Sequence, residues 1–216
     1  MDTLLPTTKH RRGRRTARQE RALAAPGEVL VALHELPSSA LLSGDDPLVL
    51  DIGFGSGEAV IALAEAEPTV VILAVDMHTP GIGDLLASVS ERGLTNVRVV
   101  DADVRHVLTA IPEGRLTGVR TFFPDPWPKK RHHRRRLITS GFADDLAGPV
   151  APGGFWHVAT DWPDYADAIE EAVSSSGSWR GGRIARPASR PQTRYERRGI
   201  AAGRLPIDLW FERVTR

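Results

Sequence analysis

The sequence of 216 residues contains no cysteine, which excludes disulfides, thiolate zinc sites, iron–sulfur clusters and cysteine nucleophiles. It also lacks any apolar run near the roughly 18 residues that a membrane-spanning helix needs. The basic N-terminus has no apolar stretch behind it, which argues against a secretory signal. The content of 41% hydrophobic and 25% charged residues is ordinary for a soluble globular protein. We therefore expect a cytoplasmic protein that does not bind membranes.

Charge is unevenly distributed although the formal net charge is only +1. Three stretches, 9–21, 129–136 and 180–198, hold 20 of the 28 Lys and Arg residues and only two acids, Glu20 and Glu196. The remainder carries 8 basic and 25 acidic residues. Each stretch alone reads as a solvated arginine-rich segment, but three together favour a polyanion held at particular places. The sequence therefore indicates a nucleic acid partner.

Residues 1–20 have little to bury, and we expect a flexible basic arm before a single domain at 21–216. From residue 47 onward, short apolar runs alternate with helical patterns. This alternation predicts an α/β fold in which a mostly parallel sheet is covered by helices on both faces. The expected strands are 47–53, 69–76, 96–103, 118–125, 153–161 and 206–214, and the expected helices are 56–68, 81–93, 104–111, 131–150 and 162–177.

Five successive expected strands deliver an aspartate to their carboxyl ends. Ligands of such folds bind outside this edge of the sheet. A run of five acids there is hard to attribute to chance loop composition. The residues are Asp51, Asp76, Asp103, Asp125 and Asp161.

The stretch "DIGFGSGEA" at 51–59 places Gly53, Gly55 and Gly57 between an expected strand and an expected helix. Glycines there let the backbone approach a ligand closely. The G-x-G-x-G spacing after Asp51 favours S-adenosylmethionine over NAD, although a plain tight turn is the simpler alternative. Asp76 is placed to accept hydrogen bonds from ribose hydroxyls, and Asp103 to contact an adenine amino group.

The stretch "FPDPWPKKRHHRRRL" at 122–136 sets Asp125 between two prolines and follows it with positive charge. The prolines restrict the backbone around the acid, and Trp127 either stacks on a base or packs. His132 and His133 suit phosphate or surface contacts better than metal ligation, and no spacing in the chain predicts a metal site. The basic residues expected to hold RNA phosphates are Lys129, Lys130, Arg131, Arg134, Arg135 and Arg136.

These segments together resemble the bacterial tRNA (guanine-N7-)-methyltransferase family over almost the whole chain. The resemblance rests on the following segments: "RRGRRTARQ" (11–19), "LDIGFGSGE", "VDMHTPGIG", "FPDPWPKKRH", "ATDWPDYA" (159–166), "TRYERRG" (193–199) and "DLWFER" (208–213). It implies a Rossmann-like class I methyltransferase fold with about seven strands, the last antiparallel. It also implies S-adenosylmethionine as cofactor, tRNA as partner and a variable-loop guanine, position 46, as target.

The resemblance also implies roles for particular residues. Cofactor contacts would come from Asp51, Asp76 and Asp103, and Asp125 would act in the reaction zone. The implied substrate contacts are Lys129, Asp161, Thr193, Arg194, Tyr195 and Glu196. The family often has Glu where this chain has Asp51 and Asp76, which shortens the reach of both acids by about one methylene.

Three other functions remain as alternatives. An exocyclic-amino methyltransferase for adenine or cytosine would have two prolines after the acid of the fourth strand, whereas here Trp127 follows one proline. A catalytically silent RNA-binding relative would not need the intact cofactor loop. A hydride-transfer dehydrogenase would need a substrate acid or base beside the glycines. The sequence shows no obligate protein partner and leaves monomer and homodimer open.

Overall fold

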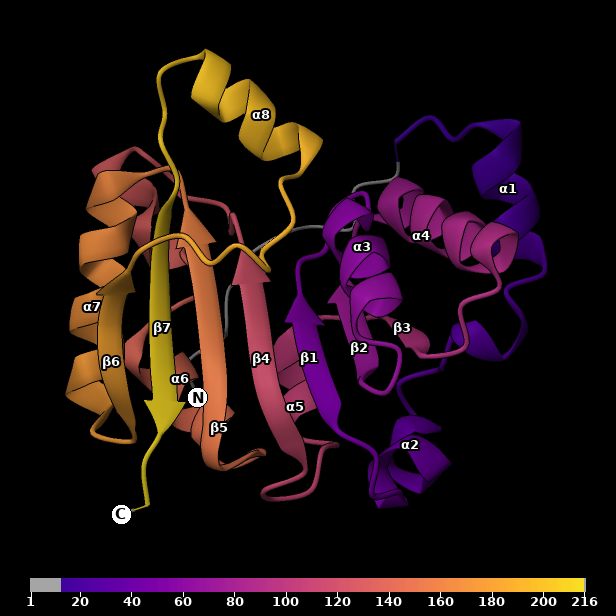
Figure 1. Ribbon diagram of the computed structural model, residues 1–216, viewed down its shortest axis with the longest axis horizontal. Helices are drawn as coiled ribbons and strands as arrows, with labels where there is room; N and C mark the ends of the chain where they lie inside the picture. Colours follow the sequence, from indigo (N-terminus) through magenta and orange to yellow (C-terminus); the bar gives the residue numbers. More distant parts are fainter. Residues whose placement is uncertain (1–12, 216) are drawn as a thin grey trace.

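The computed structural model describes residues 13–215, and its centre is a seven-stranded sheet in the order β3-β2-β1-β4-β5-β7-β6 (Figure 1). β7 is antiparallel to both of its neighbours, and every other neighbouring pair is parallel. The expected mostly parallel sheet with an antiparallel last strand is confirmed. The strands are β1 (Leu48–Ile52), β2 (Val71–Asp76), β3 (Val97–Asp101), β4 (Leu116–Phe122), β5 (Val150–Thr160), β6 (Trp179–Ile184) and β7 (Ile207–Arg213).

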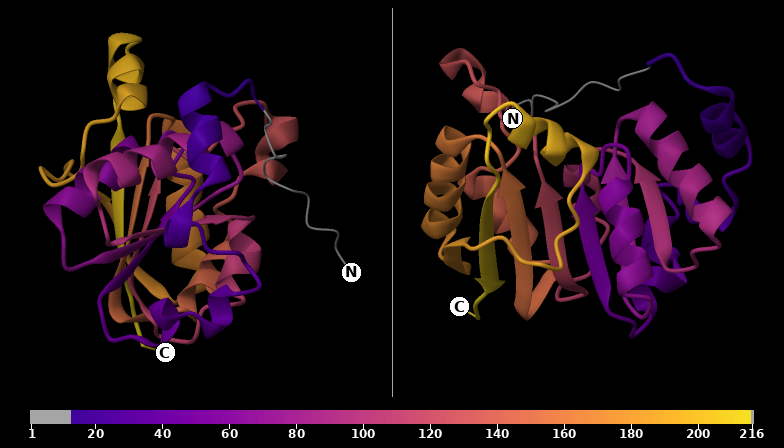
Figure 2. Two further views of the ribbon diagram at one scale, coloured as in Figure 1. Left: turned by 90° about the vertical axis from the view of Figure 1, so that its right-hand side faces the viewer. Right: turned by 45° about the horizontal axis from the view of Figure 1, so that its top comes forward.

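Helices cover both faces of the sheet (Figures 1 and 2). α3 and α4 lie in front of β2 and β3 in Figure 1, and α1 packs on α4, whereas α5, α6 and α7 lie behind the sheet. The helices are α1 (Ala17–Ala24), α2 (Ala40–Ser43), α3 (Glu58–Ala66), α4 (Thr79–Arg92), α5 (Val104–Leu108), α6 (Ser140–Ala147), α7 (Pro163–Ser176) and α8 (Arg194–Ala201), and the 3₁₀ turns are η1 (Gly27–Val29), η2 (Leu36–Ser38) and η3 (Lys130–Arg135).

The side chains of β2 alternate between two apolar clusters. Ile72 and Ala74 pack with α3 and α4, whereas Leu73 and Val75 pack in the cluster on the other face, which contains α5, α6 and α7. A strand that is buried on both faces needs a continuous apolar run. The run "VILAV" supplies it, and this burial holds the carboxyl end of β2 rigidly at the edge of the sheet.

The single helix expected over 131–150 is wrong. The basic stretch 129–136, called the basic run below, forms η3. The chain leaves helical geometry at Arg136 (ψ 134°), and α6 begins only after Thr139. The Thr139 hydroxyl accepts the Phe142 N–H at 3.2 Å and starts a new helix. Adjacent like charges in the basic run also oppose a long helix. Val150 already belongs to β5.

β6 and α8 are absent from the expected elements, because the stretch 180–198 reads as a solvated arginine-rich segment. β6 pairs with β7 along its whole length. At Gly181 (φ 146°) a Cβ atom would lie 2.0 Å from the carbonyl oxygen of Trp210, so glycine permits this close approach. α8 follows Thr193, whose hydroxyl accepts the Glu196 N–H at 3.2 Å.

The N-terminal arm expected at 1–20 overlaps a helix. Residues 1–12 lie outside the described residues, and α1 begins at Ala17, so the expected boundary at residue 20 falls inside α1. Thr16 and Gln19 form a capping box at its start. The Arg18 guanidinium donates to Glu91 at 2.7 and 2.8 Å and to Ser88 at 3.0 Å, both on α4. Residues 17–20 therefore pack on the domain.

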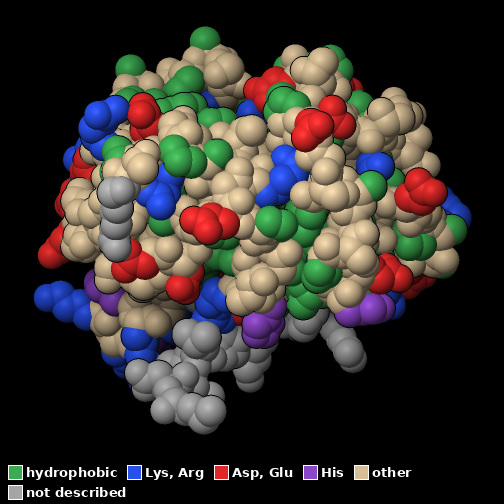
Figure 3. Space-filling view, turned by 90° about the horizontal axis from the view of Figure 1, so that it is seen from below, with side chains coloured by type: hydrophobic (Ala, Val, Ile, Leu, Met, Phe, Trp, Pro, Cys, Tyr) green, Lys and Arg blue, Asp and Glu red, His purple; other side chains and the backbone are tan. Residues whose placement is uncertain are grey.

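Seen from below, the face at the amino ends of the parallel strands mixes acidic and basic side chains (Figure 3). A group of Lys and Arg side chains protrudes at the lower left of this view. None of the helices within residues 13–215 combines the length and apolar character needed to cross a membrane.

Candidate active site

A cavity of about 380 Å³ opens at the edge of the sheet where the parallel strands end. This volume falls within the range of small-ligand sites. Three of the five strand-end aspartates line it: Asp76, Asp103 and Asp125. The structure therefore brings together acids that lie 49 positions apart in the chain. The apolar part of the wall includes Ile52, Val75, Ala102, Val104 and Leu137.

The glycine loop forms one side of this cavity. Gly53 (φ 73°) and Gly55 (φ 59°) line it, and both adopt backbone angles that favour glycine. Gly57 was expected to contact a cofactor but does not line the cavity. A Cβ atom at Gly57 would lie 2.8 Å from a Leu85 methyl carbon, so this glycine lets α4 pack close to the loop.

Asp76 organises the loop from the end of β2. Its Oδ2 accepts the Gly55 N–H at 2.8 Å, and its Oδ1 accepts the N–H groups of Met77 and His78 at 2.7 and 2.9 Å. An ionised carboxylate has about four acceptor positions. Asp76 therefore retains capacity for a ligand hydroxyl while holding the loop in place.

Asp103 lies two residues beyond β3 and is bound by both the backbone and the side chain of Arg105. It caps α5 by accepting the Arg105 N–H at 3.0 Å, and it pairs with the Arg105 guanidinium. Burial alone would raise the pKa of Asp103, but the hydrogen bonds and charge of Arg105 outweigh it and lower this pKa. Asp103 is therefore a fixed, charged wall of the cavity.

Asp51 is buried beside the last residue of β1 and does not line the cavity. Its side chain is 4% exposed, and its Oδ2 atom has no hydrogen-bond partner. Burial raises the pKa of Asp51 from its usual 3.8 to about 7, against the opposing charge of Arg120. A buried acceptor without a partner, next to a ligand cavity, is an unusual feature.

The segment 123–127 crosses the cavity rim and begins and ends with a strained residue. Phe123 (φ 56°) and Trp127 (φ 43°) have positive φ without being glycine, and Asp125 lies midway between them. Such backbone angles persist only where the surrounding structure enforces them. The Arg135 guanidinium lies 4.1 Å from the Trp127 ring centre, and both residues line the cavity.

The residues around this cavity fit S-adenosylmethionine. Gly53 and Gly55 offer close backbone approach, and Asp76 offers a carboxylate for ribose hydroxyls. The Trp127 indole Nε1 is buried without a partner, so this wall holds an unused donor for a polar ligand. The apolar wall suits a purine ring.

Comparison with known proteins supports the same interpretation. A family described as putative methyltransferase matches residues 45–209. A tRNA (guanine-N(7)-)-methyltransferase from Thiobacillus denitrificans is 42% identical, with 94% of this chain and 92% of the relative covered. The enzyme of the same name from Nitrosospira multiformis is 43% identical with the same coverage. This chain belongs to the tRNA (guanine-N(7)-)-methyltransferase family.

Solved structures at lower identity share the fold of this family member. The 16S rRNA methyltransferase KamB superposes with a TM-score of 0.61 at 18% identity, covering 82% of this chain and 91% of that chain. TrmN from Thermus thermophilus gives 0.55 at 18% identity, covering 84% and 48%. Both confirm the expected class I methyltransferase architecture.

In this family member Tyr195 on α8 lies close to Asp161, which directly follows β5. Tyr195 lines the cavity, and its ring centre is 5.2 Å from that of Phe123. Its hydroxyl lies 3.5 Å from Asp161 Oδ1, the outer limit of a hydrogen bond. Asp161 does not cap α7. It accepts the Arg204 Nε–H at 2.7 Å and borders a second cavity.

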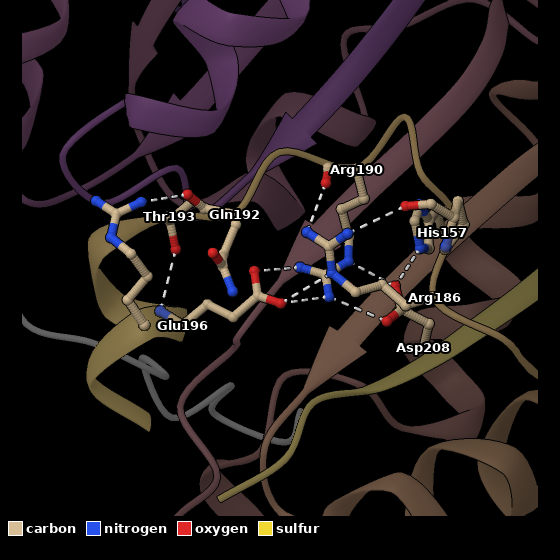
Figure 4. A network of polar contacts seen from close by, with 9 residues as sticks. His157, Arg186, Arg190, Gln192, Thr193, Glu196 and Asp208 are labelled. Carbon is tan, nitrogen blue, oxygen red and sulfur yellow. Dashed lines mark hydrogen bonds and ion pairs between the residues drawn. The ribbon is translucent and has the colours of Figure 1, made fainter. Parts of the chain in front are cut away.

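The remaining members of the T-R-Y-E segment are engaged inside the protein. Thr193 caps α8, and Arg194 donates its backbone N–H to Glu58 at 2.5 Å. Glu196 is 2% exposed and pairs with Arg186 and Arg190 (Figure 4). None of these three lines the cavity described above, although the family resemblance implies substrate contacts for them.

The basic run divides by exposure. Lys129, Lys130, Arg131 and Arg134 are exposed, whereas Arg135 is half-buried at the cavity. Arg136 is 6% exposed; it donates to the Pro126 carbonyl oxygen at 2.9 Å and to Asp164 at 2.5 Å. The expectation that Arg136 holds a phosphate is therefore corrected, because its charge is used inside the protein.

Sequence reasoning overlooked three residues that shape the site: Glu58, Arg190 and Arg204. Glu58 follows the glycine loop directly, and this position in the sequence could have identified it as a residue of the site. Arg190 and Arg204 act through contacts with distant strands and helices, which no local pattern reveals. Within residues 13–215, no group of three or more His, Asp or Glu side chains is arranged to hold a metal ion.

Proposed function

We propose that this chain transfers the methyl group of S-adenosylmethionine to N7 of a guanine in tRNA and releases S-adenosylhomocysteine. We place the target in the variable loop, at position 46. Family membership supports the reaction type. The observation that carries the proposal is the place of Asp125, between two strained residues at the rim of a cavity suited to the donor.

The chemistry needs positioning more than proton transfer. Guanine N7 has an in-plane lone pair and no proton to lose, so no general base is required. When bound, S-adenosylmethionine supplies an electrophilic methyl group. The guanine becomes cationic as it accepts this group, and a fixed carboxylate at Asp125 favours that charge. The same carboxylate can accept hydrogen bonds from guanine N1–H and the amino group, which would orient the base.

Other residues have supporting roles. Asp76, Gly53 and Gly55 hold the donor, and Tyr195 closes the cavity from α8. Exposed Lys129, at the start of η3, meets the RNA next to the target base. Lys130, Arg131, Arg134 and Arg135 position the tRNA backbone without reading its sequence.

The test is to incubate the full chain with unmodified tRNA and labelled S-adenosylmethionine, and then to map reduction- and aniline-induced cleavage. We expect incorporation of label together with cleavage at one variable-loop guanine. A tRNA transcript with 7-deazaguanine at that position is the matched control and should remain unlabelled. Labelled tRNA without cleavage at a guanine would reject N7 chemistry and favour an exocyclic amine.

A further inference from the structure

Arg190 lies at the centre of a buried ion-pair cluster between α8 and β7 (Figure 4). Its side chain is 1% exposed, as are those of Glu196 and Asp208. Arg190 Nε and Nη2 donate to Asp208 at 2.6 and 3.0 Å, and Nη1 and Nη2 donate to Glu196 at 2.8 Å each. One planar guanidinium thus engages two carboxylates in paired geometry, which lysine cannot reproduce.

Two further residues complete this cluster. His157 Nε2 lies 2.8 Å from Asp208 Oδ1. Arg186 donates to Glu196 at 3.0 Å and to the Arg190 carbonyl oxygen at 2.7 Å. Two arginines thus balance two carboxylates. Burying ion pairs is costly, and apolar replacements of similar shape are often neutral or stabilising. Stability alone is therefore a weak reason for this cluster, which points to a requirement for geometry.

The cluster connects the two parts of the chain that form the cavity rim. The Arg190 guanidinium carbon lies 5.5 Å from the Phe123 ring centre, and Phe123 begins the segment that carries Asp125. On the other side, Glu196 is adjacent to Tyr195, whose ring lies against Phe123. Arg190 therefore contacts the end of β4 and the start of α8 at once.

We propose that Arg190 is a positioning residue for methyl transfer. It holds the first turn of α8 against the end of β4, so that Tyr195 closes the cavity opposite Asp125. Arg190 itself does not line the cavity and touches neither donor nor guanine. This inference rests on the proposed function.

A double-mutant cycle tests the route from Arg190 through Tyr195. We expect Arg190→Lys to lower kcat at least 10-fold, with the donor Kd measured by calorimetry within twofold of wild type. If Arg190 acts by placing Tyr195, Arg190→Lys combined with Tyr195→Ala should be no slower than Tyr195→Ala alone. If the double variant instead loses kcat by the product of the two single losses, the proposal is overturned. Arg183→Lys is the matched control, because Arg183 pairs with Glu170 at the surface, and its kcat should stay within twofold.

A second variant separates positioning from folding. Arg190→Met with Asp208→Asn removes one charge of each sign and leaves Glu196 paired with Arg186. We expect a melting temperature near that of wild type and a kcat still at least 10-fold lower. Recovery of kcat to within twofold would show that Arg190 only stabilises the fold. Absence of guanine N7 methylation by the wild type rejects the proposed function, whereas methylation with a multiplicative cycle rejects only the role of Arg190.

Discussion

The backbone of its neighbours constrains the position of Asp125. Pro124 and Pro126 limit the backbone on each side, and positive φ at Phe123 and Trp127 turns the chain twice within five residues. Angles of this kind cost about 1–3 kcal/mol each, so the fold maintains them at the expense of stability. The result is an aspartate whose backbone is constrained at the rim of the cavity.

We predict that Asp125→Asn lowers kcat by about 100-fold or more, because an amide cannot stabilise the positive charge that develops on guanine. We expect tRNA binding to depend mainly on the basic run, so the Kd for tRNA should change less than threefold. Single-turnover methylation and filter binding measure the two quantities. Lys130→Gln is the control with the opposite expectation. It should bind tRNA more weakly but keep the wild-type single-turnover rate when the enzyme is saturated with tRNA. Turnover of Asp125→Asn equal to that of wild type would reject the role of the acid.

The buried carboxyl of Asp51 leads to a prediction about how the free energy of unfolding depends on pH. Its pKa rises from 3.8 to about 7 on folding, so the folded state binds its proton more tightly than the unfolded state. That contribution is complete below pH 4 and is lost as pH rises towards 7, to a limit of about 4 kcal/mol. Asp51→Asn should therefore be more stable than wild type at pH 8 and similar at pH 4. Denaturant unfolding at both pH values checks this, and an equal difference at the two would contradict it.

At the scale of elements, the buried strands were predictable and the last helix was not. Continuous apolar runs and strand-end aspartates reveal β1 to β5 and the ligand edge. α8 is polar and exposed on most sides, so it lacks an apolar stripe. Its one local signal is Thr193 followed three residues later by Glu196, the pattern of a capping box. In this fold Glu196 turns instead to Arg190, a contact that depends on β7.

α8 is also attached to the helix that follows the glycine loop, through Glu58 at the start of α3. The Glu58 carboxylate accepts the Arg194 backbone N–H at 2.5 Å and a guanidinium N–H of Arg197 at 3.0 Å. Glu58 is therefore a cap for α8 that comes from another helix. Burial would raise the pKa of Glu58, but these two bonds outweigh it and lower this pKa. The stabilisation from this link is therefore complete above the usual carboxyl pKa of 4.5 and is lost as pH falls through the lowered pKa of Glu58.

We predict that Glu58→Ala frees the start of α8. Loss of a helix cap costs about 1 kcal/mol, which corresponds to roughly 5-fold faster amide exchange in α8. The KM for tRNA should rise by a similar factor. Hydrogen exchange read by mass spectrometry measures the first effect and steady-state kinetics the second. Glu65→Ala is the control, since Glu65 lies on the same helix and pairs with exposed Arg92. Identical exchange of α8 in both variants would contradict the cap.

At the scale of the whole molecule, charge counts in the sequence overstate the basic surface. The stretch 180–198 holds seven arginines, but Arg190 is buried and three others pair with acids from elsewhere in the fold. A further one, Arg186, pairs with Glu196 inside the stretch. Charge pairing between distant segments is invisible in a sequence, which is why this patch looked like a site for RNA. The run 129–136 keeps most of its charge exposed and remains the candidate phosphate surface.

We therefore predict that the salt dependence of tRNA binding comes mainly from this run. Each phosphate contact contributes about 0.7–0.9 to the slope of log K against log salt. Replacing Lys130, Arg131 and Arg134 together by Gln should lower that slope by about 2–3 and weaken binding at low salt. Arg136→Gln removes one positive charge from a buried position beside Asp164. It should therefore lower the melting temperature and leave the slope of log K against log salt unchanged. A slope that falls with Arg136→Gln but not with the triple replacement would reverse this assignment of exposed and buried charges.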